Sequence, residues 1–160
     1  MAAEGQIKVG GILQNRGLCM VSVMSAPDRP GIAAALFQAL GQERLNAQFI
    51  VQNIDLNNDT HVMFCVAIED CERVMAAVEP VALALEAQRV VKVSPVVLVC
   101  VFGPDFRERP GIASAAFGAL ARSGINILAV STSISTISCV IQEKDCEAAM
   151  RALCEVFAVP

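Results

Sequence analysis

The chain has 160 residues and a formal net charge of −4, and 55% of its residues are hydrophobic whereas only 18% are charged. Because the net charge is negative and Lys and Arg form no cluster, we do not expect nucleic-acid binding. The longest apolar run, Val96–Phe102, is far shorter than the ~18 residues that a membrane-spanning helix needs, so we expect no membrane insertion. The high apolar fraction predicts surfaces that become buried by self-association.

Seven cysteines occur in the sequence, none of them in a Cys-x-x-Cys pair of the kind that zinc sites and redox motifs use. We interpret all seven as free, reduced side chains that fill apolar positions: Cys19, Cys65, Cys71, Cys100, Cys139, Cys146 and Cys154. No basic segment followed by an apolar core opens the chain, as a secretory signal would. These features predict a reducing, cytoplasmic location and no metal site.

Hydrophobic periodicity and turn-forming residues predict the elements of the first half in chain order. They are a strand at 7–13, a turn at 15–17, a strand at 18–25, a helix at 30–42, strands at 47–56 and 60–68, a helix at 70–86 that Pro80 should kink or split, and a strand at 88–93. From 18 onwards this order is βαββαβ. It predicts a four-stranded antiparallel sheet with both helices on one face.

The second half repeats the first at a constant offset of 80 positions, which indicates an internal duplication. Pro30-Gly31-Ile32-Ala33 recurs as Pro110-Gly111-Ile112-Ala113, and Asn46 recurs as Asn126. The repeated elements are a strand at 96–102, a helix at 110–123, strands at 125–132 and 136–142, and a helix at 144–157. This half is one strand short, and an apolar sheet edge without a partner is a liability. We therefore predict that the N-terminal strand completes the second sheet.

The repeated Pro-Gly marks the start of each first helix. Proline suits the first helical turn because its missing N–H would have had no partner there. The neighbouring glycine leaves the backbone uncovered, so the free N–H groups at the positive end of the helix are suited to binding a carboxylate.

These motifs carry a resemblance to a known family. A βαββαβ unit with Pro27-Asp28-Arg29-Pro30-Gly31 after its first strand resembles an ACT domain, and the pair resembles the regulatory region of aspartate kinase, especially the separate regulatory β-subunit of some bacteria. Further matching stretches are Ile50-Val51-Gln52-Asn53, Gly124-Ile125-Asn126-Ile127, Ser131-Thr132-Ser133 and Ile137-Ser138-Cys139-Val140-Ile141. The fold class expected is α+β, with two ferredoxin-like ACT units in tandem. The units would span residues 14–94 and 95–160, with strand 6–13 completing the second.

The resemblance implies a non-catalytic regulatory protein without a cofactor, which binds an amino-acid effector of the lysine or threonine type at a homodimer interface. It also implies a kinase catalytic subunit as a partner. The effector would lie between the first unit of one chain and the second unit of another. The positions that match the family's effector site are Asp28, Gly31, Ile32, Ala33, Gln52, Asn126 and Ile127.

Each polar candidate has a role that its chemistry suggests and a structural alternative. Asp28 would accept the effector's ammonium, but an Asp just before a helix is also a common N-cap. Asn126 would supply an oriented amide, but its repetition as Asn46 fits a turn equally well. Gln52 is the hardest to explain structurally, because an amide on an apolar strand needs a partner.

The chain also departs from the family's pattern, and the departures leave the effector and the partner open. The substituted positions are Arg44, where the family has glycine, Gln48, where it has an acid, Asp105, where it has glycine, and Ile134 after Ser-Thr-Ser. Two other functions therefore remain open: a stand-alone amino-acid sensor with another target, and a ligand-free assembly module. Catalysis is not expected, because His61, the only histidine, is interpreted as a surface residue of a hairpin and no phosphate-binding loop is present.

Overall fold

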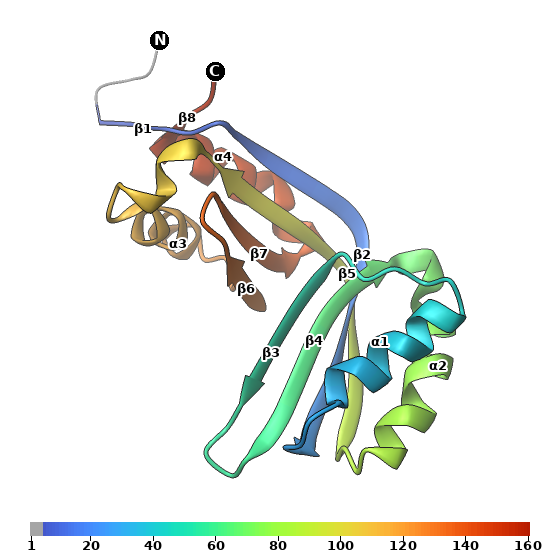
Figure 1. Cartoon of the computed structure of the whole chain (residues 1–160). Coiled ribbons are helices and arrows are strands. Elements are labelled where there is room, and N and C mark those ends of the chain that lie inside the picture. The colour runs from blue at the N-terminus through green and yellow to red at the C-terminus, as the bar shows by residue number, and fades with distance from the viewer. Residues whose placement is uncertain (1–4) are drawn as a thin grey trace. The chain divides into compact units, whose positions relative to one another are not determined.

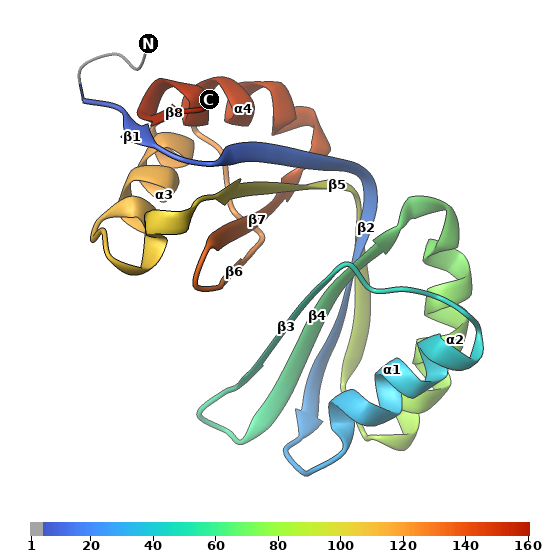
Figure 2. The same cartoon turned by 45° about the horizontal axis from the view of Figure 1, so that its top comes forward.

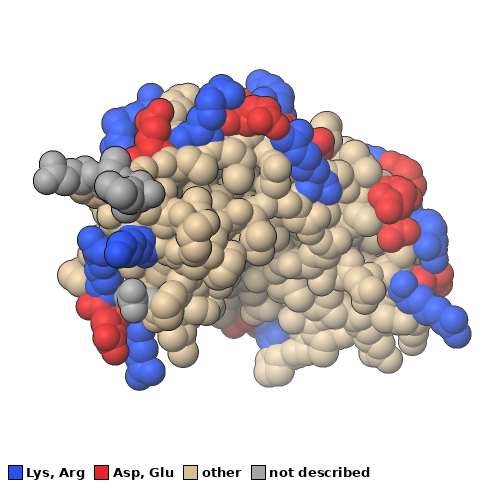
Figure 3. Space-filling view, turned by 90° about the horizontal axis from the view of Figure 1, so that it is seen from above, with Lys and Arg blue, Asp and Glu red and all other residues tan. Residues whose placement is uncertain are grey.

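The computed structural model describes residues 5–160, apart from the side chain of Asp105. The described chain forms two compact units, one of residues 17–95 and one that combines 5–16 with 96–160. Within residues 5–160, every helix is too short or too polar to cross a bilayer. Charged side chains are sparse on the face in Figure 3, where uncharged atoms cover most of the surface.

The unit of residues 17–95 is a sheet with the strand order β3-β4-β2-β5, in which β4 pairs antiparallel with both β2 and β3. Helices α1 and α2 lie side by side on one face of this sheet (Figures 1 and 2). The elements, in chain order, are β2 (Gly11–Pro27), α1 (Ile32–Gln42), β3 (Phe49–Ile54), β4 (Asp59–Ala67), the 3-10 turn η1 (Ile68–Asp70), α2 (Cys71–Ala84) and β5 (Arg89–Phe102).

The core of this unit follows from the two hydrophobic periods of its sequence. Residues 18–23 of β2 are all buried, and its alternate residues Cys19, Val21 and Val23 belong to one core cluster, as the period of two of a strand predicts. In α1, Leu36 and Leu40 are spaced four apart and are also buried, which places them on one helical face. Burying each such side chain stabilises the fold by roughly 1.5–3 kcal/mol.

The other unit has the strand order β2-β5-β7-β6, with antiparallel pairs between β5 and β7 and between β6 and β7. Strand β1 (Ile7–Lys8) pairs in parallel with β8 (Phe157–Ala158). The remaining elements are the 3-10 turn η2 (Pro104–Arg107), α3 (Ile112–Arg122), β6 (Ala129–Thr132), β7 (Thr136–Gln142), the 3-10 turn η3 (Glu143–Asp145) and α4 (Cys146–Val156).

The N-terminal residues complete this second sheet, as the repeat predicts. The N–H of Gly10 donates to the carbonyl oxygen of Phe102 at 2.7 Å, and the side chain of Val9 is buried in the core. A Cβ atom at Gly10 would lie 2.9 Å from the Phe102 ring, and one at Gly11 2.7 Å from it. The two glycines therefore let the backbone pass directly over an aromatic ring.

Several predictions about the elements and their boundaries are wrong. The turn expected at residues 15–17 does not interrupt β2, although Gly17 has a φ of 69°. The strands expected at 88–93 and 96–102 are one continuous strand, β5, which passes through the cis Ser94-Pro95 bond. Of the kink or split expected at Pro80, the split does not occur, because α2 continues through this residue. Buried residues on both sides of Pro80, Val78 and Ala82, hold this helix against the sheet where propensity alone would end it.

The cysteines are not all free, contrary to the prediction. A disulfide joins Cys19 of β2 to Cys71 at the start of α2. Both half-cystines are buried in the core of the unit of residues 17–95. Of the free cysteines, Cys65, Cys139 and Cys146 are buried, and burial raises the pKa of the Cys65 and Cys139 thiols to about 12. The prediction of a reducing location assumed seven free cysteines, and the disulfide removes two of them.

Candidate functional site

The repeated Pro-Gly segment forms the turn that precedes α1 and is not part of the helix. The helix begins at Ile32 and not at Pro30 as predicted. Gly31 is the N-cap residue and has a φ of 99°, in the left-handed region that residues with a Cβ disfavour. The same geometry recurs at Gly111, with a φ of 90°, before α3. The glycine of the repeat is therefore required by the backbone turn.

The N-terminus of α1 has no side-chain cap. The carbonyl oxygen of Gly31 accepts a hydrogen bond from the N–H of Ala35 at 2.9 Å, which closes the first helical turn. The N–H groups of Ile32, Ala33 and Ala34 precede that bond, so they have no acceptor within the helix. No acidic side chain stands in the first turn, and no side chain caps the helix. These donors, at the positive end of the helix dipole, suit a carboxylate.

A surface hollow of about 370 Å³ opens at this helix end. It contains five of the predicted site residues, from the turn after β2, the first turn of α1 and strand β3: Asp28, Gly31, Ile32, Ala33 and Gln52. Sequence analysis missed three further lining residues, Arg29, Pro30 and Ala34. The repeated Pro-Gly-Ile-Ala segment was the signal that could have found Pro30. The volume fits a small ligand.

Asp28 supplies the carboxylate of this hollow and does not cap the helix, so its alternative interpretation as an N-cap is wrong. Its Oδ1 accepts a hydrogen bond from the Thr60 hydroxyl at 2.9 Å, and its N–H donates to the carbonyl oxygen of Asn58 at 2.9 Å. Asp28 is exposed, whereas Thr60 is fully buried. The neighbouring Arg29 forms an ion pair with Glu86 at 3.7 Å. An exposed, oriented carboxylate therefore stands beside an uncapped helix end.

Gln52 is exposed on β3, the edge strand of its sheet. The amide of Gln52 therefore needs no partner within the protein, contrary to the interpretation from sequence. Its backbone pairs with Val62 of β4, and its neighbours Ile50 and Ile54 are about half exposed, at 49% and 50%. Strand β3 is apolar although no other described element fully covers these two side chains. Its hydrophobic pattern therefore did not show that β3 lies at the edge of the sheet.

The structure does not bring Asn126 and Ile127 into this hollow. Both belong to the unit that includes residues 96–160, where they follow α3. Asn126 is exposed and Ile127 packs against the core of its own unit.

The departures from the family pattern have different structural settings. Arg44 has a φ of 56°, so a residue with a Cβ occupies the left-handed conformation where the family has glycine. The side chain of Ile134 is 68% exposed between β6 and β7. Gln48 is exposed, and its N–H donates to the Cys65 carbonyl oxygen at 2.8 Å. The side chain of Asp105 lies outside the described residues.

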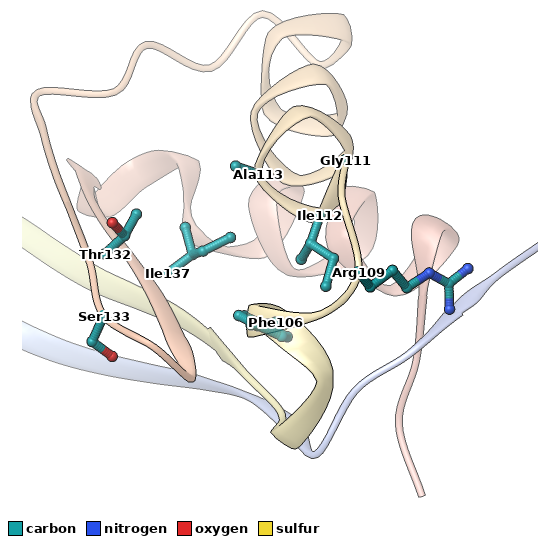
Figure 4. Close-up of a pocket in the computed structure, with 8 residues that line it drawn as sticks. All are labelled: Phe106, Arg109, Gly111, Ile112, Ala113, Thr132, Ser133 and Ile137. Atoms are coloured by element: carbon teal, nitrogen blue, oxygen red, sulfur yellow. The ribbon is translucent and has the colours of Figure 1, made fainter.

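A second hollow, of about 270 Å³, occupies the corresponding place in the other unit. Its lining residues are Phe106, Arg109, Gly111, Ile112, Ala113, Thr132, Ser133 and Ile137 (Figure 4). None of these described lining residues is acidic, and Figure 4 shows the guanidinium of Arg109 directed away from Thr132 and Ser133. The position that matches Asp28 is the exposed Glu108, which does not line the hollow. The two hollows therefore have the same backbone geometry but differ in the charged side chains that are described at each, Asp28 and Arg29 in the first and Arg109 in the second.

His61 is largely buried, with a side chain 13% exposed, so its interpretation as a surface residue is wrong. Its Nδ1 accepts a hydrogen bond from the N–H of Ser25 at 3.1 Å, and its Nε2 lies 2.8 Å from Oδ2 of Asp55. The hydrogen bond with His61 lowers the pKa of Asp55. With both ring nitrogens engaged, His61 is a structural link and not a free base. Among the described residues, no three His, Cys, Asp or Glu side chains gather as metal ligands would.

Comparison with known proteins places this geometry in a family. ACT domains match residues 21–80 and 99–157, more than half of the chain. An aspartokinase from Helicobacter pylori is 35% identical over 153 residues, which are 93% of this chain but 36% of that protein. The chain therefore spans about a third of the length of the curated relatives it matches.

Solved structures with a similar fold support the family match over most of the chain. The regulatory subunit of aspartate kinase from Thermus flavus has a TM-score of 0.85 at 27% identity, and the match covers 92% of this chain and 97% of that one. A structure of aspartokinase alpha and beta subunits has a TM-score of 0.84 at 28% identity, with the same coverage of 92% and 97%. The chain thus belongs to the ACT-domain family, as a tandem pair that is similar to the regulatory part of aspartate kinases.

Proposed function

We propose that this chain is a non-catalytic regulatory protein that binds a free amino acid in the hollow at Asp28 and acts allosterically on a kinase catalytic subunit. One observation carries the proposal. A single hollow combines an uncapped helix N-terminus, with the N–H groups of Ile32 and Ala33, and the exposed carboxylate of Asp28. A free amino acid carries the complementary groups, a carboxylate and an ammonium, a few ångströms apart.

Each group of the ligand has an assigned partner. The α-carboxylate accepts hydrogen bonds from the first N–H groups of α1, where the helix dipole favours negative charge. The α-ammonium binds Asp28 through a charge-assisted hydrogen bond. Gln52 at the rim offers an amide to the ligand's side chain. Because Arg29 is paired with Glu86, the carboxylate of Asp28 is left to bind the ammonium, and the proposal covers effectors of both the threonine and the lysine type.

The proposed assembly is a homodimer, in which Asn126 and Ile127 from the second unit of one chain complete the site on the first unit of the other. The exposed apolar residues of edge strand β3, Ile50 and Ile54, support such an interface, because edge strands with apolar faces are usually covered. We assign residues 14–94 and 95–160 to the two domains of each protomer, and strand 6–13 to the second domain. Solved relatives named as subunits of aspartate kinase support the catalytic partner. The cytoplasmic location is part of the proposal and rests on the sequence.

The mechanism is linkage between the site and the arrangement of the chains. An effector that binds one arrangement more tightly shifts the population towards it, and the shift is limited by the difference between the two affinities. A stand-alone sensor would use the same site on another target. A ligand-free assembly module would keep the fold but show no response to amino acids.

A thermal-shift panel of the twenty amino acids at millimolar concentration tests this proposal. A dye is required for detection, because the sequence contains no Trp or Tyr. A ligand at a hundred times its dissociation constant stabilises the folded state by about 2.7 kcal/mol. For a chain of this size, that corresponds to a rise of roughly 5–10 °C in the melting temperature. We expect one amino acid to give such a rise in the wild type.

The matched variants are Asp28→Asn and, in the second repeat, Glu108→Gln. We expect the first to lose most of the rise, through weaker binding that calorimetry still measures at higher ligand concentration, and the second to retain it, because Glu108 is not among the lining residues of the second hollow. If the folded wild type responds to none of the twenty amino acids, the sensor proposal fails and the assembly module remains.

A further inference from the structure

Thr60 is the buried neighbour of the hollow that no sequence motif indicated. It lies in β4, with its backbone paired to Ala26 of β2 and to Ile54 of β3. Its side chain is fully buried, yet its hydroxyl donates to Oδ1 of Asp28 at 2.9 Å. Burying a hydroxyl is costly unless it is hydrogen-bonded, and the partner that satisfies the Thr60 hydroxyl is the exposed carboxylate at the hollow.

We infer that Thr60 is a positioning residue for the ligand hollow, which orients Asp28 so that its Oδ2 receives the ammonium of an amino acid. The inference rests on the proposed function. The bond to Thr60 occupies Oδ1 and, together with the bond from the Asp28 N–H to Asn58, restricts the rotation of an otherwise exposed side chain. A carboxylate held in place loses less conformational freedom when the ligand binds, so the ligand binds more tightly.

The positions of the second repeat that correspond to Thr60 and Asp28 differ from them, so the inference applies to the hollow at Asp28. Counted back from the aligned core residues Val62 and Ile137, the position of Thr60 corresponds to Ser135, and that of Asp28 to Glu108. Ser135 and Glu108 are both exposed. Among the described side chains, the oriented carboxylate is therefore a feature of the first unit, and we expect one ammonium-binding site for each chain.

Calorimetric titration with L-threonine and with L-lysine tests the inference in four proteins. Thr60→Val removes the hydroxyl and nearly preserves the side-chain shape, whereas Thr60→Ser keeps the hydroxyl and removes a methyl group. For the titrant that binds the wild type, we expect Thr60→Val to raise the dissociation constant about tenfold, as for the loss of one hydrogen bond to a charged group. Thr60→Ser should bind within about twofold of the wild type, and so should the control Ser135→Ala.

A double-mutant cycle separates positioning from general structural damage. If Thr60 acts through the carboxylate, Thr60→Val should have no further effect on affinity once Asp28→Asn is present, because the two residues then act as one unit. An equal loss in both backgrounds would overturn the inference, and so would weak binding by Thr60→Ser with unchanged binding by Thr60→Val.

The outcomes distinguish this inference from the proposed function. If the wild type binds a titrant and Thr60→Val binds it equally well, the inference fails while the proposed function stands. If the folded wild type binds no amino acid at all, the proposed function fails and the inference fails with it.

Discussion

The imidazole of His61 and the carboxylate of Asp55 form a link of 2.8 Å between Nε2 and Oδ2 that ties β4 to the turn after β3. Oδ1 of the same carboxylate accepts hydrogen bonds from the N–H groups of Asn57 at 2.7 Å and Asp59 at 3.1 Å. The bond with His61, followed by the bond from Asp59, lowers the pKa of Asp55 below its ordinary value of 3.8.

This lowered pKa predicts a specific acid sensitivity. A carboxyl group whose pKa is lower in the folded state than in the unfolded state stabilises the fold above its unfolded pKa, and that stabilisation is lost as the pH falls through the folded pKa. We therefore expect Asp55→Asn to be less stable than the wild type at neutral pH, with the difference shrinking below about pH 4. Urea unfolding between pH 2 and pH 7 measures this, and a difference that is constant over the whole range would contradict it.

The left-handed conformation of Gly31 predicts a cost for any side chain there. A Cβ at Gly31 would have no atom within 4 Å, so the penalty of Gly31→Ala is conformational and not steric. We expect a loss of about 1–2 kcal/mol in the free energy of unfolding. Gly41 is the matched control, because it lies inside α1 with equally open surroundings, and Gly41→Ala should stabilise the chain by roughly 0.5–1 kcal/mol. Denaturant unfolding measures the free energy of unfolding of both variants. If Gly31→Ala leaves it unchanged, the left-handed geometry of the N-cap is refuted.

The disulfide between Cys19 and Cys71 predicts sensitivity to reductants. It closes a loop with a sequence separation of 52, which includes α1, β3 and β4. In the chain-entropy description such a loop contributes about 4 kcal/mol. Dithiothreitol should therefore lower the melting temperature of the wild type by about 10 °C. It should leave Cys19→Ser unchanged, and Cys154→Ser should respond like the wild type. Equal melting temperatures of the wild type with and without the reductant would count against the crosslink.

The placement of the N-terminal strand predicts that the second unit depends on it. Val9 is buried in the core of this unit, and Gly10 donates to Phe102 at the edge of β5. A fragment of residues 95–160 should therefore fail to unfold cooperatively or should aggregate, because its β5 edge is uncovered. Circular dichroism and gel filtration test this, with the chain lacking only residues 159–160 as the control. A soluble, cooperatively folded fragment would show that the second unit does not need the N-terminal strand.

Sequence alone predicted the architecture well because the architecture is repeated. The offset of 80 positions predicted both βαββαβ units and the strand that the second unit lacked. Boundaries failed where tertiary contacts override local propensity, as at Pro80 within α2. They also failed at Pro30, where the left-handed Gly31 delays the helix.

The candidate site was predicted only in part, for a different reason. The residues adjacent in sequence, such as Asp28 and Gly31, were found through their motif. Thr60 was missed, because it lies 32 positions from Asp28 and its hydroxyl has no repeated counterpart. Gln52 was found, but with the wrong reason, because hydrophobic pattern does not tell an edge strand from a central one. Contacts between distant residues carry no local signal.

The most direct test of the account is an NMR titration with the amino acid that gives the largest thermal shift. We predict that the amide resonances of Gly31, Ile32, Ala33 and Ala34 move most, together with the side-chain amide of Gln52. Those of Gly111, Ile112 and Ala113, which have the same local geometry but no acid among the described lining residues, should move least and serve as the internal control. Shifts concentrated in the second repeat, or no shifts at saturating concentration, would contradict the claim that the chain senses an amino acid at Asp28.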